Sequence, residues 1–199
     1  MENERRRRVG EITRETKETR VLVRVSPDGS GTADIGTGIG FFDHLLTALA
    51  FHSGFDIRLE CKGDLGVDDH HTAEDCALAL GQALDAALGD RAGIERFGFA
   101  YAPLDEALAR AVIDLSGRPS AHVDLGLVRP AIGEIASENI AHVLSSFATA
   151  ARAALHVDVI KGQNDHHRAE AAFKALALAL RAAVSVEGRQ LIPSTKGTL

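Results

Sequence analysis

Two segments of this chain, residues 66–87 and 162–183, are near copies of each other. An offset of 96 residues aligns them, and about half of the aligned positions are identical, including the hexamers "DHHTAE" (69–74) and "DHHRAE" (165–170). Two copies are too few for a solenoid, which needs about three or more repeats. The repeat therefore predicts a pseudo-symmetric pair of half-domains that share one core.

The length of 199 residues suits one domain, or two small halves with a common core. We treat residues 1–199 as a single domain made of halves at about 10–95 and 96–199. The segment 90–103, with sequence "DRAGIERFGFAYAP", is expected to contain the boundary.

Each half is expected to contain strands followed by helices. Alternating apolar residues predict strands at 18–27 and 54–64, and the second half repeats the plan with strands at 110–119, 120–127 and 154–162. Helical periodicity appears at 41–53, 72–89, 137–151 and 168–186. This order predicts an α/β (α+β) fold, a tandem duplication in which each sheet carries two helices on one face.

The composition excludes several classes of function. A net charge of −6 argues against a nucleic-acid surface, and no apolar stretch approaches the length of a membrane span. No apolar run follows the arginines of "MENERRRRVG", so we expect a solvated arm and no secretory signal. Cys61 and Cys76 are too few for a disulfide framework, and we expect them to be small buried residues of a cytoplasmic protein.

The repeated hexamers have the spacing of metal ligands. At the start of a helix, residues four apart share a face, so His70 with Glu74, and His166 with Glu170, can contact one ion each. The neighbouring His71 and His167 point about 100° away and are free for another ion or another subunit. The alternative is a helix N-terminus with solvated imidazoles, in which Asp69, Thr72 and Asp75 act as caps. We assign those three residues the capping role and still favour metal, because the pattern occurs twice.

A third matched histidine in each half completes the proposed ligand sets. His44 and His142 lie 98 residues apart, each on the other predicted helix of its half. The proposed division gives one ion His70, Glu74, His142 and His167, and the other His166, Glu170, His44 and His71. Mixed imidazole and carboxylate ligands with open positions suit Mn²⁺, Fe²⁺ or Zn²⁺. His122 and His156 lack this symmetry and are interpreted as ordinary strand residues.

With these motifs the chain closely resembles the imidazoleglycerol-phosphate dehydratase family. The resemblance rests on "TKETRVLV" (16–23), "TGIGFFDHLL" (37–46), the two histidine blocks, "PLDEALARAVIDLSGRP" (103–119) and "IPSTKG" (192–197). Leu45 and Ala48 stand where family members commonly have methionine and glutamine, but neither is an expected metal ligand. The resemblance implies a duplicated fold like domain 2 of ribosomal protein S5. It also implies two Mn²⁺ ions per active site, although other divalent transition metals remain open.

The activity that the resemblance implies is a dehydration in histidine biosynthesis. Imidazole glycerol phosphate would lose water to give imidazole acetol phosphate, through a metal-bound imidazolate and a diazafulvene-like intermediate. The metal-ligating histidines and glutamates of the hexamers would be catalytic, and Glu18 of "TKET" would be the base that takes the carbon-bound proton. Without the family, Glu18 is an exposed charge at a strand edge.

The resemblance also implies a set of residues that bind the substrate and its phosphate: Glu18, His52, Arg96, Arg118, Lys174, Ser194, Thr195 and Lys196. Several have plainer interpretations, since Lys174 can form a helical ion pair with Glu170 and Arg118 can be a turn residue. Their wide separation along the chain favours a site made from several subunits. The resemblance implies a homo-oligomer, a shell of 24 copies built from trimers, with active sites between subunits.

Two other functions stay open on the residues alone. A di-metal hydrolase would also place two ions beside a phosphate site, although it usually requires bridging aspartates. A metal-storing shell would use the histidines only for assembly. The combination of "TKET", "STKG" and the histidine blocks favours the dehydratase, because storage requires no phosphate-binding tail.

Overall fold

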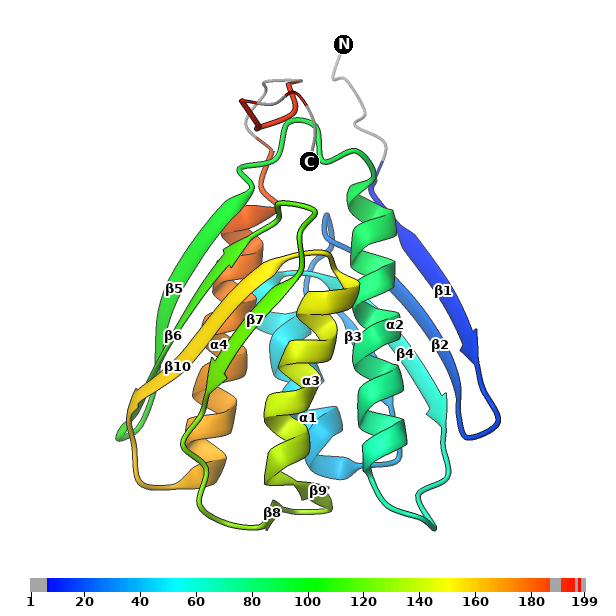
Figure 1. Ribbon diagram of the computed structural model, residues 1–199, viewed down its shortest axis with the longest axis vertical. Helices are drawn as coiled ribbons and strands as arrows, with labels where there is room; N and C mark the ends of the chain where they lie inside the picture. Colours follow the sequence, from blue (N-terminus) through cyan, green and yellow to red (C-terminus); the bar gives the residue numbers. More distant parts are fainter. Residues whose placement is uncertain (1–6, 187–190, 196, 198–199) are drawn as a thin grey trace.

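The computed structural model describes residues 7–186, 191–195 and 197, and within them the chain forms two four-stranded sheets with four helices between them (Figure 1). The first sheet has the order β1 (Gly10–Glu15), β2 (Arg20–Ser26), β4 (Asp56–Lys62) and β3 (Ala33–Gly36). The second has the order β5 (Phe97–Leu104), β6 (Ala107–Asp114), β10 (Ala154–Lys161) and β7 (Ser120–Asp124). A short hairpin of β8 (Ala131–Ile132) and β9 (Ile135–Ala136) precedes the third helix.

The helices cover one face of each sheet, as the sequence predicts. Helices α1 (Gly40–Ser53) and α2 (His70–Leu88) pack on the first sheet, and α3 (Ser137–Ala150) and α4 (Asp165–Ala183) pack on the second. Helix α2 also packs against α3, and α1 against α4, so one core spans both halves. None of the described helices is long and apolar enough to cross a membrane.

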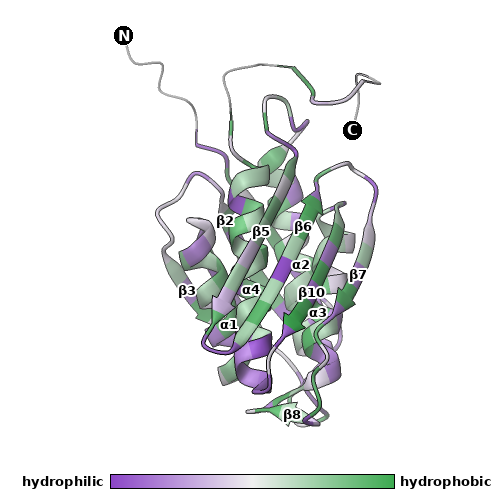
Figure 2. Ribbon diagram, turned by 90° about the vertical axis from the view of Figure 1, so that its left-hand side faces the viewer, coloured by the Kyte–Doolittle hydropathy of each residue, from purple (hydrophilic) through white to green (hydrophobic). Residues whose placement is uncertain are grey.

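The two sheets share one topology. In each, three strands run antiparallel in succession, and the last strand lies parallel to its neighbour, β3 beside β4 and β7 beside β10. Alternation produces the inner faces: Val21, Val23 and Val25 of β2 are buried while the residues between them are exposed. Figure 2 views the outer face of the second sheet, with the helices behind it.

The two halves also share the same close contact between a strand and a helix. At Gly10 a Cβ atom would lie 1.9 Å from the carbonyl oxygen of Ala83, and at Gly98 it would lie 1.9 Å from that of Ala179. Each half therefore lays its first strand directly on a helix backbone at a position where only glycine fits. The two alanines differ by 96 residues, the offset of the repeated hexamers.

The expected helices and the five expected strands are present, with α4 beginning at Asp165, earlier than predicted. Strands β1, β3 and β5 and the short hairpin of β8 and β9 were not predicted. Strand β1 is a half-exposed strand at the sheet edge with charged residues, and β3 has only four residues. Strand β5 occupies much of the segment 90–103 that we assigned to the boundary, and it belongs to the second sheet.

The predicted capping role of Asp69, Thr72 and Asp75 is wrong. Asp69 precedes α2 but makes no side-chain cap, and its carboxylate instead accepts a hydrogen bond from the backbone of Ala136 at 2.8 Å. The Thr72 hydroxyl is buried without a partner among the described residues. Asp75 is buried and accepts hydrogen bonds from Arg14 and Thr19. Because the first turn of α2 is packed against other elements, Asp69 and Asp75 bond across the fold instead of to their own helix.

Candidate metal centre and active site

The first cluster of possible metal ligands joins α2 to α3. One nitrogen or oxygen from each of His70, Glu74 and His142 lies within 4.8 Å of the others. The His142 Nε2 is 2.9 Å from Glu74 Oε1, and the rings of His70 and His142 stack with centroids 5.0 Å apart. Nδ1 of His70 lies 3.0 Å from Oδ1 of the buried Asn139, which leaves Nε2 of His70 facing the cluster.

The second cluster joins α1 to α4 in the same way. His44, His166 and Glu170 again bring their ligand atoms within 4.8 Å of one another. The Nε2 atoms of His44 and His166 lie 2.9 Å and 3.2 Å from the same carboxylate oxygen, Oε2 of Glu170. Two histidines and one glutamate thus converge in each half, from a pair of helices that the fold packs together.

The two clusters differ in their surroundings. Lys174 donates to the other oxygen of Glu170 at 2.8 Å, whereas the corresponding residue after Glu74 is Leu78. Burial raises the pKa of Glu170, but the hydrogen bonds of His44 and Lys174, together with the charge of Lys174, outweigh it and lower the pKa to about 2. The Glu170 carboxylate is therefore ionised at any pH at which the histidines are neutral, as metal binding requires.

The donor sets fit a divalent transition metal. Each cluster offers two imidazole nitrogens and one carboxylate, without thiolate, and is half-exposed. Mixed nitrogen and oxygen ligands of this kind suit Mn²⁺, Fe²⁺ or Zn²⁺ and disfavour a closed structural zinc site. Three ligands from one chain leave room for further ligands from another copy or from a substrate.

His71 and His167 belong to neither cluster in the described chain. Nδ1 of His71 lies 2.9 Å from Asp64, and Nδ1 of His167 lies 2.7 Å from Glu106. Each hydrogen bond raises the pKa of its histidine. The remaining nitrogen of each ring, Nε2, points away from the carboxylate that holds Nδ1. Sequence reasoning missed Asp64, Glu106 and Asn139 because single polar residues in loops and helices carry no distinctive spacing.

Glu18 lies in the turn between β1 and β2, close to His71. Its carboxylate is about half exposed, and Oε1 is 3.9 Å from Nε2 of His71. Within the part of the chain that the structure describes, its one other hydrogen bond is through the backbone, since its N–H donates to Thr16 Oγ1. The carboxylate therefore stands beside a candidate ligand with both oxygens accessible.

Two of the residues expected at the phosphate, Arg96 and Ser194, lie near the C-terminal end of α4. The backbone N–H of Arg96 donates to the carbonyl of Ala183, and its guanidinium donates to Asp114 and to the carbonyl of Pro193, next to Ser194. Arg118 lies in the turn after β6, exposed, and within the described residues its guanidinium forms no ion pair. Thr195 is exposed, and Lys196 falls outside the described residues.

Lys174 and His52 lie between the two ends of α4. Lys174 forms the helical ion pair with Glu170 that the sequence offered as an alternative. Burial and the charge of Lys174 lower the pKa of His52, which ends the last turn of α1. From His166 to Ala183, α4 is roughly 25 Å long at 1.5 Å per residue. One chain therefore places the metal cluster at the start of α4 far from Arg96 at its end, although Lys174 lies next to Glu170.

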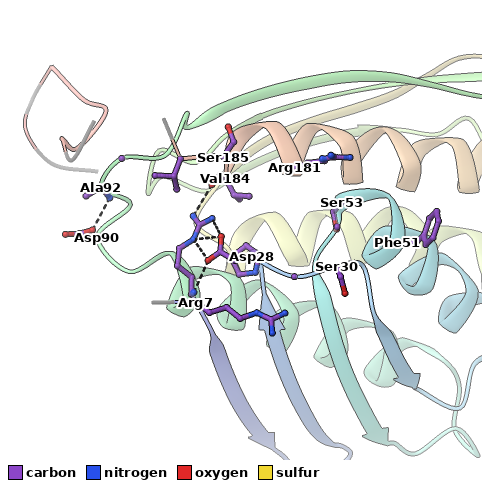
Figure 3. A pocket seen from close by; sticks show the side chains of 16 residues that line it. Arg7, Asp28, Ser30, Phe51, Ser53, Asp90, Ala92, Arg181, Val184 and Ser185 are labelled. Atoms are coloured by element: carbon purple, nitrogen blue, oxygen red, sulfur yellow. Dashed lines mark hydrogen bonds and ion pairs between the residues drawn. The ribbon is translucent and has the colours of Figure 1, made fainter. Parts of the chain in front are cut away.

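A cavity of about 1270 Å³ lies elsewhere in the chain (Figure 3). Its lining includes Arg7, Arg8 and Arg181, and Arg8 is already bonded to Asp28 and to the carbonyl of Val184. None of the predicted site residues lines it. A cavity within one chain does not mark the site when the ligand clusters face outward.

Comparison with known proteins decides the family. The family model described as imidazoleglycerol-phosphate dehydratase matches residues 37–180. This chain belongs to the imidazoleglycerol-phosphate dehydratase family. A relative of that name from Pyricularia oryzae is 54% identical over 94% of this chain and 96% of its own length. A relative from Kluyveromyces lactis is 52% identical over 98% of both chains.

A relative from Phytophthora nicotianae is 60% identical over 96% of this chain, which spans only 42% of that protein. Solved imidazoleglycerol-phosphate dehydratases have the same fold. That from Staphylococcus aureus matches with a TM-score of 0.81 at 35% identity, covering 90% of this chain and 99% of its own. That from Pyrococcus furiosus matches with a TM-score of 0.82 at 37% identity, covering 94% and 100%. The chain is accordingly a hydro-lyase of histidine biosynthesis, with a mixed α/β fold.

Proposed function

We propose that this dehydratase acts on imidazole glycerol phosphate with two divalent ions per active site, of which Mn²⁺ is our first choice. The observation that carries the proposal is the pair of matched clusters, His70–Glu74–His142 and His44–His166–Glu170. Chance does not account for two histidines and a glutamate converging twice at equivalent places. When bound, the ions would supply positive charge that favours the imidazolate form of the substrate ring.

Side chains of the protein would remove the proton and bind the phosphate. Loss of the ring N–H proton would make the ring electron-rich enough to expel the neighbouring hydroxyl, which would leave as water by taking up a proton, with a diazafulvene-like intermediate remaining. Removal of the carbon-bound proton would then give an enol, which becomes the ketone. Glu18 removes the carbon-bound proton, and its exposed carboxylate beside His71 supports this role. Arg96, Arg118 and the 194–196 segment bind the phosphate, with Lys174 and His52 between them and the metal end.

A complete site requires more than one copy of the chain. Imidazole glycerol phosphate, with one ring and a three-carbon chain, is too short to bridge the roughly 25 Å between the metal cluster at the start of α4 and Arg96 at its end. The outer face of β5 supports contact between copies, because Phe97, Phe99 and Tyr101 are 60%, 74% and 54% exposed there. We propose a homo-oligomer in which neighbouring copies complete each site, and a 24-copy shell built from trimers as its form.

The location that we propose is the cytoplasm. Cys61 and Cys76 lie within hydrogen-bonding range of each other as free thiols, a state that a reducing compartment preserves. Fractionation of cells followed by immunoblotting tests this location.

The test of the function is turnover of imidazole glycerol phosphate by protein stripped of metal, with and without added Mn²⁺. We expect no ketone product from stripped protein and restored product with Mn²⁺. Glu18→Gln should lose turnover but bind Mn²⁺ normally, whereas His70→Ala should lose both. Uptake of Mn²⁺ and assembly without product would favour a metal-storing shell and contradict the dehydratase mechanism.

A further inference from the structure

The strand registers make Glu106 the counterpart of Glu18. Gly10 lies opposite Val25 in the first sheet, and Gly98 lies opposite Ile113 in the second. A shift of 88 residues relates both pairs, and Gly10 and Gly98 make the same close contact with their helices. The same shift places Glu106, in the turn between β5 and β6, at the position of Glu18.

The two glutamates are bonded differently. Oε1 of Glu106 accepts the backbone N–H groups of Gln163 and Asn164, and Oε2 lies 2.7 Å from Nδ1 of His167. Both of its oxygens are therefore engaged. Glu18 approaches Nε2 of His71 only at 3.9 Å, and within residues 7–186, 191–195 and 197 its carboxylate accepts no backbone N–H. One member of the duplicated pair is committed to the loop before α4, and the other is free to act on substrate.

Asp64 takes over in the first half the contact that Glu106 makes in the second. Its Oδ2 lies 2.9 Å from Nδ1 of His71, and among the described residues its side chain makes no other hydrogen bond or ion pair. The segment from Lys62 to His70 is three residues longer than the segment from Lys161 to His166, and Asp64 lies in it. Two carboxylates from unrelated positions thus hold the same nitrogen of two equivalent histidines.

A carboxylate that accepts the Nδ1–H of a histidine determines which ring nitrogen is available as a metal ligand. A neutral imidazole that donates Nδ1–H to a carboxylate has its lone pair on Nε2, the nitrogen that points away. We propose that Asp64 and Glu106 are positioning residues, which present Nε2 of His71 and His167 as metal ligands, and that Asp64 frees Glu18 to be the base. This inference rests on the proposed function, because it assumes that both histidines bind metal.

The test is a titration of stripped full-length protein with Co²⁺, followed through the visible absorption bands that report coordination geometry. Asp64→Ala is the most informative variant, because within the described residues its side chain bonds only to His71, through Oδ2, while Oδ1 is buried without a partner. We expect Co²⁺ affinity at one of the two sites to fall about 10–100-fold, with altered bands. Asp64→Asn, which keeps an oxygen for Nδ1–H, should recover part of the loss.

Two controls separate positioning from general damage. Glu11→Gln removes an exposed carboxylate that pairs with Arg24 on the first sheet, and it should bind Co²⁺ like the original protein. Glu18→Gln should keep the affinity and lose turnover. Asp64→Ala with unchanged affinity and bands would overturn the positioning role, while the metal proposal would stand. Failure of the unaltered protein to bind Co²⁺ would overturn both.

Discussion

Replacing Gly98 by alanine tests whether strand β5 lies directly on the backbone of α4. The new Cβ would lie 1.9 Å from the Ala179 carbonyl oxygen and 2.9 Å from the Ala183 nitrogen. Ordinary contact begins at 3.4 Å, so the strand must retreat by about 1.5 Å. Neither partner is a flexible side chain that could move aside. We expect a loss of about 3 kcal/mol in the free energy of unfolding, at the upper end for overpacking.

The assay is urea unfolding at fixed protein concentration, with a chelator present so that binding of divalent metal does not contribute to the measured stability. With a slope of about 3 kcal/mol per M urea for a chain of this length, the midpoint should fall by about 1 M. Gly10→Ala should behave alike, because its Cβ would lie 1.9 Å from Ala83. Gly36→Ala is the control, since no atom lies within 4 Å of its Cβ. If Gly98→Ala shifts the midpoint no more than Gly36→Ala, the close packing of strand on helix is refuted.

Three further changes have defined outcomes. Arg91→Met should cost about 3 kcal/mol in urea unfolding, because Arg91 is 2% exposed and holds Asp85 and the carbonyls of Ala151 and Arg152; a neutral result would contradict this. The backbone N–H of Ser30, outweighing burial, helps lower the pKa of Asp56 from 3.8 to about 2, so its ionised form stabilises the fold above pH 3.8 and the benefit disappears as pH falls through 2. The destabilisation by Asp56→Ala should therefore shrink as unfolding is measured from neutral pH towards pH 2, and a constant difference would argue against it. Lys174→Gln should lower kcat/KM about tenfold or more, mainly through KM, by loss of a charge-assisted contact to phosphate; an unchanged KM would leave Lys174 only as the partner of Glu170.

The duplication made most of the fold predictable. The repeated hexamers and the helical periodicity after them indicated the helices and their equivalence, and strong alternation indicated β2, β4, β6, β7 and β10. Strands β1 and β3 were missed because edge strands bury few side chains, so their sequences show little apolar alternation. The capping role of Asp75 was wrong for a tertiary reason, since Arg14 approaches it from β1 and Thr19 from the turn before β2.

Only the site residues that follow helical spacing or the repeat offset were predictable from the sequence. The i, i+4 spacing joins His166 to Glu170, and the matched offset of 98 residues pointed to His44 and His142. Asn139, Asp64 and Glu106 were not predictable, because their contacts depend on how loops and helices meet. The sequence likewise does not show that the carboxylates of Glu106 and Glu18 have different hydrogen-bond partners, because both are glutamates in turns.

The central claim is that the metal clusters of one copy act with the phosphate residues of another. Two variants test it most directly: His166→Ala, which removes a ligand, and Arg118→Ala, which removes an exposed cation near the other end of α4. Each alone should have little activity. The two variants are mixed in equal amounts, dissociated by removal of metal and reassembled with Mn²⁺. In half of the sites the metal cluster then comes from a copy with His166, and in half the phosphate residues come from a copy with Arg118. Both are intact in about a quarter of the sites, so about a quarter of the original turnover should return. Recovery no greater than the sum of the separate variants would contradict the shared site.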